Sequence, residues 1–503
     1  MTPSERRLHP LSFMFVIASQ VRQLVVPGLV VLVGAGSAGL DWQAWLILLI
    51  IPYALIAVIQ SITFKYRFEA DELVMTSGLV FRNERHVPYS RIQNIDAVQN
   101  VLHRLLRVTE VRLETGGGDE PEARMRVVPL PALDEIRARV AIGRGHRHVP
   151  ASGPSDVQAV ERRVVLALGP RELLLAGFID SRGLIIVGAA FGLLSELGLF
   201  DAASDMVIGD DVSARGVVRQ AIGAVFGGGL PSIGQVAVLL TAFVGFVLVI
   251  RVLSMIWSVV RLWSFQLDKQ GDDLAVQYGA FTRVIASIPL RRIQTLTISA
   301  SPLHRLCRMV SVRADSAGGG GGGEGAAAKR ESLAPIVRRS ELARLLGEVI
   351  PELDWSSVSW FAVHPRAFRR ALKSSLVFAA ICILPFTAML RWWTVAAVAM
   401  GILWACVHAR LYVKSLGWAI ADDTVLFRSG WLWRELTIAR FNKIQAVALT
   451  ESPFDRRASM ATVRVDTAAA SAHRVTIPYL AQKTADDLYR TLAAHAARTA
   501  FRW

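Results

Sequence analysis

The sequence predicts a membrane protein in which α-helical hairpins, with six transmembrane helices in all, alternate with three small β-rich domains, each capped by a C-terminal helix. Two observations lead to this fold class: long apolar runs occur in three pairs, and a stretch of mixed polarity that recurs three times follows each pair. Apolar residues make up 53% of the 503 residues, which exceeds the roughly 45–50% of ordinary soluble domains. Membrane helices account for such an excess.

The recurring stretch occupies residues 72–115, 273–316 and 423–467 and aligns without gaps. In each copy a glycine stands 15 residues before an Ile-Gln pair, a basic residue stands two places before the glutamine, and arginines follow 11 and 19 residues after it. These positions are Gly78, Arg91, Gln93, Arg104 and Arg112; Gly279, Arg292, Gln294, Arg305 and Arg313; and Gly430, Lys443, Gln445, Arg456 and Arg464. Five positions in register through three copies indicate an internal repeat of one small domain.

The apolar runs come in pairs directly before each copy. They span residues 24–40 and 44–64, 183–200 and 233–260, and 375–390 and 392–413. At 1.5 Å per residue, each approaches or crosses a hydrocarbon core about 30 Å thick. A cleaved signal peptide ending near the small residues 35–38 is the alternative for the first run. A hairpin explains both runs of that pair and is preferred.

Each pair is preceded by an amphipathic lead that contains a proline. We therefore divide the chain into a lead with hairpin 1 (1–64), small domain 1 (65–147), a linker, lead and hairpin 2 (148–260), small domain 2 (261–354), a lead with hairpin 3 (355–413) and small domain 3 (414–503).

Basic residues gather at the ends of the apolar runs that face the small domains, while the hairpin tips carry few. Under the positive-inside rule, both termini and all three small domains are expected in the cytoplasm. We therefore attribute the formal net charge of +15 to basic residues of the protein that lie beside the membrane surface. Nucleic acid is not expected as a partner.

Within the small domains the pattern is that of β-strands. Residues 108–115 (VTEVRLET) alternate apolar with polar side chains, which is typical of a sheet with one wet face. In each copy a later strand that contains a proline is followed by a helical stretch. Several strands capped by one C-terminal helix outline a pleckstrin-homology-like (PH-like) barrel.

The succession of glycine, strand, basic-x-Ile-Gln, Leu-x-Arg and Val-Arg resembles the bacterial PH-like domain of the YdbT-type membrane proteins, and the plan of the whole chain is similar to theirs. One departure is Arg440, which stands where the other copies have Pro88 and Pro289. The resemblance implies a bacterial inner-membrane protein without enzymatic activity, associated with resistance to membrane-active antimicrobials. It also implies a smaller membrane protein with one PH-like domain as a partner.

The repeated positions have structural and functional interpretations. We interpret the glycines and glutamines as structural, because a glutamine amide can tie neighbouring loop backbone. The repeated cations are candidates for binding anionic lipid or a partner, and the basic character of any domain beside a bilayer explains them equally well. In the apolar runs, Glu196 and Arg251 either pair or reach opposite interfaces.

Catalytic and metal chemistry have no support in the sequence. The three cysteines, Cys307, Cys382 and Cys406, are far apart, and no HExxH or Ser-His-Asp order occurs. The glycine run 318–323 is not followed by the Gly-Lys-Ser/Thr of a phosphate loop. We expect no enzyme, cofactor or metal, and predict a membrane scaffold or sensor that supports envelope integrity. A transporter of lipid or a small amphiphile, gated by the small domains, is the alternative.

Overall fold

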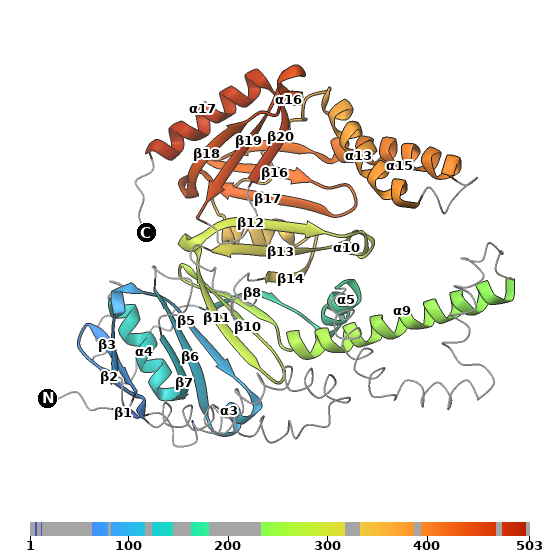
Figure 1. The fold of residues 1–503 in the computed structure, drawn as a ribbon. Helices are drawn as coiled ribbons and strands as arrows, with labels where there is room; N and C mark the ends of the chain where they lie inside the picture. Colours follow the sequence, from blue (N-terminus) through green and yellow to red (C-terminus); the bar gives the residue numbers. More distant parts are fainter. Residues whose placement is uncertain are drawn as a thin grey trace, which may run out of the picture.

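The computed structural model describes residues 6–7, 12, 63–78, 82–115, 123–143, 162–180, 233–316, 332–386, 394–468 and 475–498. These residues form one elongated β-rich body, with the first copy of the repeat at one end and the third copy at the other (Figure 1). Two pairs of helices extend from the same side of this body.

All three copies have the same order of elements: three antiparallel strands, a 3-10 turn, three more strands with a short helix after the first, and a closing helix. The first copy consists of β2 (Lys65–Phe68), β3 (Glu72–Ser77), β4 (Asn83–Pro88), η1 (Tyr89–Arg91), β5 (Ile92–Gln99), α3 (Val101–Leu105), β6 (Val108–Thr115), β7 (Ala123–Pro129) and α4 (Leu130–Gly143). The second consists of β9 (Gln266–Gln270), β10 (Asp273–Tyr278), β11 (Arg283–Pro289), η2 (Leu290–Arg292), β12 (Ile293–Ala300), α10 (Pro302–Leu306), β13 (Met309–Ser316), β14 (Ser332–Arg338) and α12 (Leu342–Val349). The third consists of β15 (Gly417–Ala421), β16 (Thr424–Ser429), β17 (Arg434–Arg440), η5 (Phe441–Lys443), β18 (Ile444–Thr450), α16 (Pro453–Arg457), β19 (Met460–Thr467), β20 (Val475–Ala481) and α17 (Gln482–Arg498).

The strands and closing helices form where the polarity pattern predicts them. In β6 the side chains of Val111 and Leu113 are fully buried, two residues apart on one face of the strand. In α17 the buried residues Ala485, Leu488 and Leu492 recur at helical spacing. In the third copy, Val463 and Val465 of β19 and these residues of α17 belong to one core.

The leads before the hairpins contribute a strand that the amphipathic interpretation missed. β1 (Arg6–Arg7) pairs with β2, β8 (Arg162–Ala167) pairs with β9, and Phe361 forms a β-bridge with Trp418 of β15. Each small domain thus takes an extended segment from the chain that precedes its pair of apolar runs.

The sheets run across the boundaries between copies. Strand β11 of the second copy pairs with β5 of the first, and β17 of the third copy pairs with β12 of the second. The results are a seven-stranded sheet, β7-β6-β5-β11-β10-β9-β8, and a six-stranded sheet, β14-β13-β12-β17-β16-β15. The three domains are therefore joined by main-chain hydrogen bonds and do not close as separate barrels.

The predicted total of six transmembrane helices is wrong for the described part of the chain, where two helices are long and apolar enough to cross a bilayer. These are residues Phe243–Leu262 of α9 (Ile233–Leu262), and α15 (Thr394–Ser415). The predicted runs 24–40 and 183–200, and nearly all of 44–64, lie outside the described residues.

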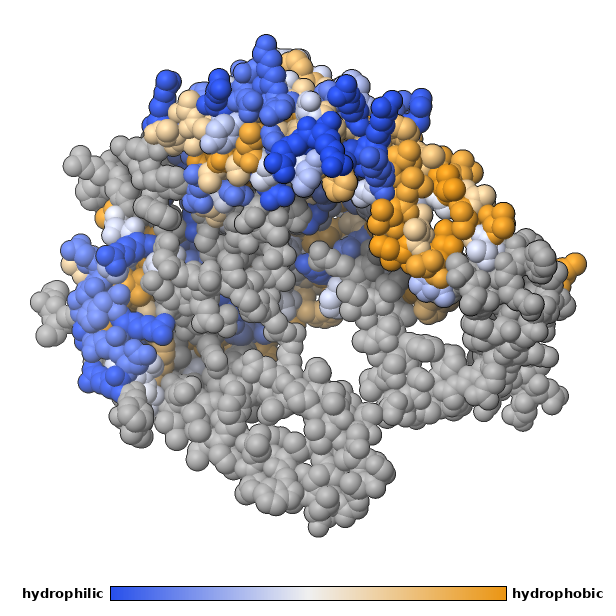
Figure 2. All heavy atoms as spheres, turned by 45° about the horizontal axis from the view of Figure 1, so that its top comes forward, coloured by the Kyte–Doolittle hydropathy of each residue, from blue (hydrophilic) through white to orange (hydrophobic). Residues whose placement is uncertain are grey.

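In its described part, which ends at Phe386, the run predicted at 375–390 is α-helical only as far as Ile383. α13 (Ala367–Ile383) carries three cations in its first two turns, and the 3-10 turn η3 (Leu384–Phe386) follows it. The ten residues 374–383 span about 15 Å at 1.5 Å per residue, about half of the hydrocarbon thickness. Figure 2 shows hydrophobic side chains gathered over α13 and α15, on the right of the view.

Candidate functional site

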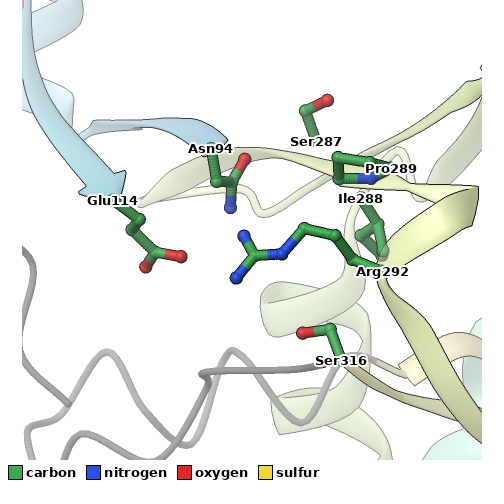
Figure 3. A pocket seen from close by; sticks show the side chains of 7 residues that line it. All are labelled: Asn94, Glu114, Ser287, Ile288, Pro289, Arg292 and Ser316. Carbon is green, nitrogen blue, oxygen red and sulfur yellow. The ribbon is translucent and has the colours of Figure 1, made fainter. Parts of the chain in front are cut away.

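The junction between the first and second copies encloses a small polar pocket. Asn94 of β5 and Glu114 of β6 form one wall, and β11, η2 and the end of β13 form the other. The cavity measures about 10 Å³, which is room for about one water molecule. The guanidinium group of Arg292 points into it toward Asn94 and Glu114 (Figure 3). The pocket places a cation of one copy against a buried carboxylate of the preceding copy.

The second junction adds a cation, Arg440, which pairs with Glu352 at 3.4 Å. Lys443 occupies the position of Arg292, and Arg440 occupies the position of Pro289. Burial lowers the pKa of the Lys443 ammonium group, and the positive charges of Arg440 and Arg291 lower it further. The Arg440 Nη2 atom donates to the Val349 carbonyl at 2.7 Å, so this cation is held inside the junction.

This charge cluster makes replacement of Lys443 by methionine stabilising at neutral pH. Since the pKa is depressed only in the folded protein, the unfolded chain binds the proton more tightly, and the charge costs stability below the folded pKa. As the pH rises through the pKa that Lys443 has in the folded protein, the ammonium group loses its proton there, and the stability that its charge cost is regained. We expect a higher melting temperature for Lys443→Met at pH 7, with the difference shrinking as the pH approaches 10.5, the ordinary value for lysine. Calorimetry in detergent over this range measures it. A lower melting temperature at pH 7 would contradict the assignment.

The repeated arginine in the short helix joins successive copies. The Arg104 Nη2 atom donates to the Ala280 carbonyl at 2.6 Å, and the Arg305 Nη2 atom donates to the Leu432 carbonyl at 3.2 Å. Both acceptors lie in the turn that follows the repeated glycine of the next copy. Arg456 occupies the same position in the third copy and is exposed. The sequence interpretation of these arginines as lipid ligands missed this contact between copies.

The other predicted cations do not gather into one surface. Arg112 pairs with Glu110 at 2.9 Å, and the Arg313 Nη2 atom donates to the Ser299 hydroxyl at 3.2 Å. Both therefore bind within their own sheets. Arg464 is exposed on β19 and Arg91 is exposed on η1. The nine cations are distributed over the junctions and the sheet faces.

The repeated glycines adopt backbone conformations that other residues rarely adopt. Gly78, Gly279 and Gly430 have φ values of 97°, 113° and 79°, in the region where a side chain is strained. The Gln294 Nε2 atom donates to the Arg292 carbonyl at 3.2 Å, as expected for an amide that ties backbone. Gln445 is exposed, and the side chain of Gln93 lies outside the described residues.

Sequence reasoning also overlooked a repeated arginine 11 residues before each glutamine. Arg283 lies opposite Gln99, and Arg434 lies opposite Ala300, at the outer end of each junction. The equivalent residue in the first copy is Arg82. The spacing was visible in the sequence, but its meaning depends on which strands pair.

The two membrane charges are not seen together, because Glu196 lies outside the described residues. The Arg251 Nη1 atom donates to the Phe178 carbonyl at 2.8 Å, and the Ser254 hydroxyl donates to the Asp180 carbonyl at 2.7 Å. These are carbonyls at the C-terminal end of α5 (Pro170–Ile179), which lack partners within that helix. Arg251 therefore helps to cap α5 against α9.

Comparison with known proteins agrees with this architecture. A family model described as the bacterial PH domain matches residues 21–142, 222–352 and 375–496, which confirms the threefold repeat. The chain is also 23% identical over 484 residues to the transmembrane protein YdbT of Bacillus subtilis (strain 168), covering 92% of each chain. With three matches that together cover most of its length, this membrane protein belongs to the bacterial PH domain family.

Proposed function

We propose that this protein is a non-enzymatic scaffold or sensor of the bacterial inner membrane. Its PH-like domains lie in the cytoplasm and hold a protein partner or anionic lipid beside the bilayer. The work of the scaffold is to support envelope integrity or resistance to membrane-active antimicrobials.

The observation that carries the proposal is the continuous pairing of sheets between copies. Six residue pairs join β12 to β17, and three join β5 to β11. A chain of domains joined by main-chain hydrogen bonds keeps its binding surfaces at fixed positions relative to the membrane helices. Such a body can present several weak sites to one ligand or partner, and avidity then raises the total affinity.

A basic collar at the base of the third helical pair supports contact with anionic lipid. It consists of five exposed cations, Arg366, Arg369, Lys373, Arg410 and Lys414. The segments α13 and α15 contain no acidic residue. Cations at the end of a membrane helix mark the cytoplasmic side, and each gains about 1 kcal/mol near anionic lipid.

Neutralising four collar cations, as Arg369→Gln, Lys373→Gln, Arg410→Gln and Lys414→Gln, is expected to reduce the retention of anionic lipid. The loss should be largest at low salt, because screening weakens these contacts. The matched control removes four exposed cations of β19 and α17, Arg464, Lys483, Arg490 and Arg498, none of which belongs to α13 or α15. Lipid bound to the purified variants is quantified after extraction from native membranes. Equal retention by both variants would refute the role of the collar.

The proposal as a whole is tested by native mass spectrometry of the full-length protein after gentle extraction from its own membrane. A smaller membrane protein at a fixed ratio, or retained anionic lipid, is the expected result. A protein that carries neither, and instead exchanges lipid between vesicles, would replace the scaffold by a transporter.

A further inference from the structure

Each copy of the repeat carries one short helix with exposed apolar side chains. α3, α10 and α16 have five residues each, and in α3 and α16 the third residue, His103 or Asp455, is buried. The exposed apolar residues are Val101, Leu102 and Leu105 of α3, Leu306 of α10 and Phe454 of α16. A single exposed leucine is ordinary, but apolar side chains exposed at the same element in all three copies indicate a contact surface.

α3 is attached to the end of α9 that enters the second copy. The backbone amides of Gly279 and Ala280 donate to the carbonyls of Trp263 and Val260 at 2.9 and 3.0 Å, so the turn between β10 and β11 caps α9. The Arg104 Nη2 atom of α3 donates to the Ala280 carbonyl of the same turn. α3 therefore lies where α9 leaves the small domain.

α10 is attached to α15 in the same manner. Arg305 of α10 donates to Leu432 in the turn between β16 and β17, and Trp431 of this turn packs edge-on against His408 of α15, with 6.2 Å between the ring centres. His408 lies seven residues before Ser415, the last residue of α15, or about 10 Å along the helix. Two cations of the basic collar lie in this interval. The turn that holds α10 therefore lies at the level of the collar.

α16 is attached to the beginning of α13. The Arg370 Nε atom of α13 lies 3.3 Å from the Asp455 carboxylate of α16, and the same guanidinium group lies 5.3 Å from the centre of the Phe454 ring. Arg369 and Lys373, two members of the basic collar, are neighbours of Arg370 in the first two turns of α13. α16 therefore lies among cations at the base of the third helical pair.

Aromatic side chains are exposed at the same level. Trp263 directly follows α9 and is 52% exposed, while Phe281 and Trp433, in the two turns that hold the short helices, are 64% and 65% exposed. Tryptophan is enriched where membrane proteins cross the boundary between lipid and water. We define the interfacial rim as these aromatic residues with the most exposed residue of each short helix: Leu105, Trp263, Phe281, Leu306, Trp433 and Phe454.

We propose that the interfacial rim is inserted into the headgroup layer of the bilayer that α9 and α15 cross. Each small domain then contacts the membrane through its own short helix as well as through the membrane helices. Amphipathic segments bury an apolar face roughly 5–10 Å into the boundary between headgroups and acyl chains, and the collar cations beside the rim attract anionic headgroups. Lipid is the occupant because all three short helices are attached to the bases of helices with apolar exposed surfaces (Figure 1).

The inference requires α9 and α15 to be membrane helices, and it does not depend on the scaffold or sensor function. Its consequence is that the β-rich body cannot swing freely below the membrane. Three points of insertion, together with the main-chain pairing between copies, fix the orientation of the sheets relative to the bilayer.

Lipid-borne quenchers test the insertion in full-length protein whose three native cysteines are changed to serine. Single cysteines at the test sites, Leu105→Cys, Leu306→Cys and Phe454→Cys, carry a nitrobenzoxadiazole dye. The matched controls are Arg91→Cys, Arg291→Cys and Asn442→Cys, exposed residues at the other ends of β5, β12 and β18. A strand of seven or eight residues separates each control from its test site, which is about 25 Å in the extended conformation.

The labelled proteins are reconstituted into vesicles of phosphatidylethanolamine and phosphatidylglycerol. We expect a lipid with a nitroxide close to its headgroup to quench the test sites several-fold more strongly than the controls, and more strongly than a lipid with a nitroxide at the end of its acyl chain. Aqueous iodide should quench the controls more strongly than the test sites. Leu102→Cys, on the same short helix, replaces Leu105→Cys if the latter lowers the melting temperature.

Two outcomes would overturn the proposal. Quenching of the test sites by iodide to the same extent as the controls would show that the rim faces water. Protection of the test sites from both iodide and nitroxide lipid would show that protein covers the rim. Neither outcome bears on the scaffold function, because retention of a partner or of anionic lipid is measured separately.

Discussion

Replacement of Ile298 by alanine is expected to lower the free energy of unfolding by about 2–5 kcal/mol, the range for large-to-small changes in a packed core. The side chain is 6% exposed and belongs to a core that includes residues of the second and third copies. Its strand, β12, pairs with β13 of its own copy and with β17 of the next. A cavity at this position therefore weakens two copies together.

The matched control is Leu449→Ala. Leu449 occupies the same position in β18, but it is half-buried, and among the described residues no strand of another copy pairs with β18. Chemical denaturation of the purified protein in detergent, monitored for each copy by hydrogen exchange, should show a smaller loss for Leu449→Ala, confined to the third copy. Equal losses, or a loss from Ile298→Ala that leaves the third copy protected, would show that the copies fold independently.

Replacement of Gly430 by alanine is expected to destabilise the third copy by about 1–3 kcal/mol, the cost of a strained backbone conformation. The φ angle of Gly430 is 79°, and a Cβ atom would also collide with the carbonyl oxygen of Trp433. The same turn carries Leu432, whose carbonyl accepts from Arg305. The change should therefore loosen the junction between the second and third copies as well.

Gly347→Ala is the control for this prediction. Gly347 lies inside α12, and nothing stands within 4 Å of the position of a Cβ atom there. Alanine is favoured over glycine in a helix interior by about 0.5–1 kcal/mol, so this variant should be slightly more stable than the natural protein. Thermal unfolding of both variants in one detergent compares them. Destabilisation of the two variants by the same amount would contradict the role assigned to the Gly430 turn.

Local features of the fold could be predicted because they depend on neighbours in the sequence. The alternation in residues 108–115 identified β6, and the recurring glycines, which were interpreted as structural, adopt a positive φ. The number of membrane helices could not be predicted in this way. Hydropathy averages over a window, so the run at 375–390 passed, although α13 ends at Ile383 and a 3-10 turn follows it. The first extended segment of each domain was missed because a pair of apolar runs separates it from its partner in the sequence.

The roles of the repeated cations depended on contacts between distant residues. Arg104 and Arg305 were recognised as repeated residues, but their acceptors lie 176 and 127 residues away in the chain. Arg292 was recognised as a candidate, but the Asn94 and Glu114 side chains toward which it points belong to the preceding copy. Spacing in one copy carries no information about the surface that the next copy presents.

The sequence by itself determined that one small β-rich domain occurs three times, that each copy ends in a helix, and that apolar segments precede the copies. These features follow from periodicity and backbone preference, which act over a few residues. Only the tertiary structure decided that the copies share sheets, that Arg104 and Arg305 bind the next copy, and that the short helices lie at the bases of the helical pairs. The reason is physical: the edge of a β-sheet offers the same main-chain hydrogen bonds to any strand, so the partner is selected by the packing and charge of surfaces that meet only in the folded protein.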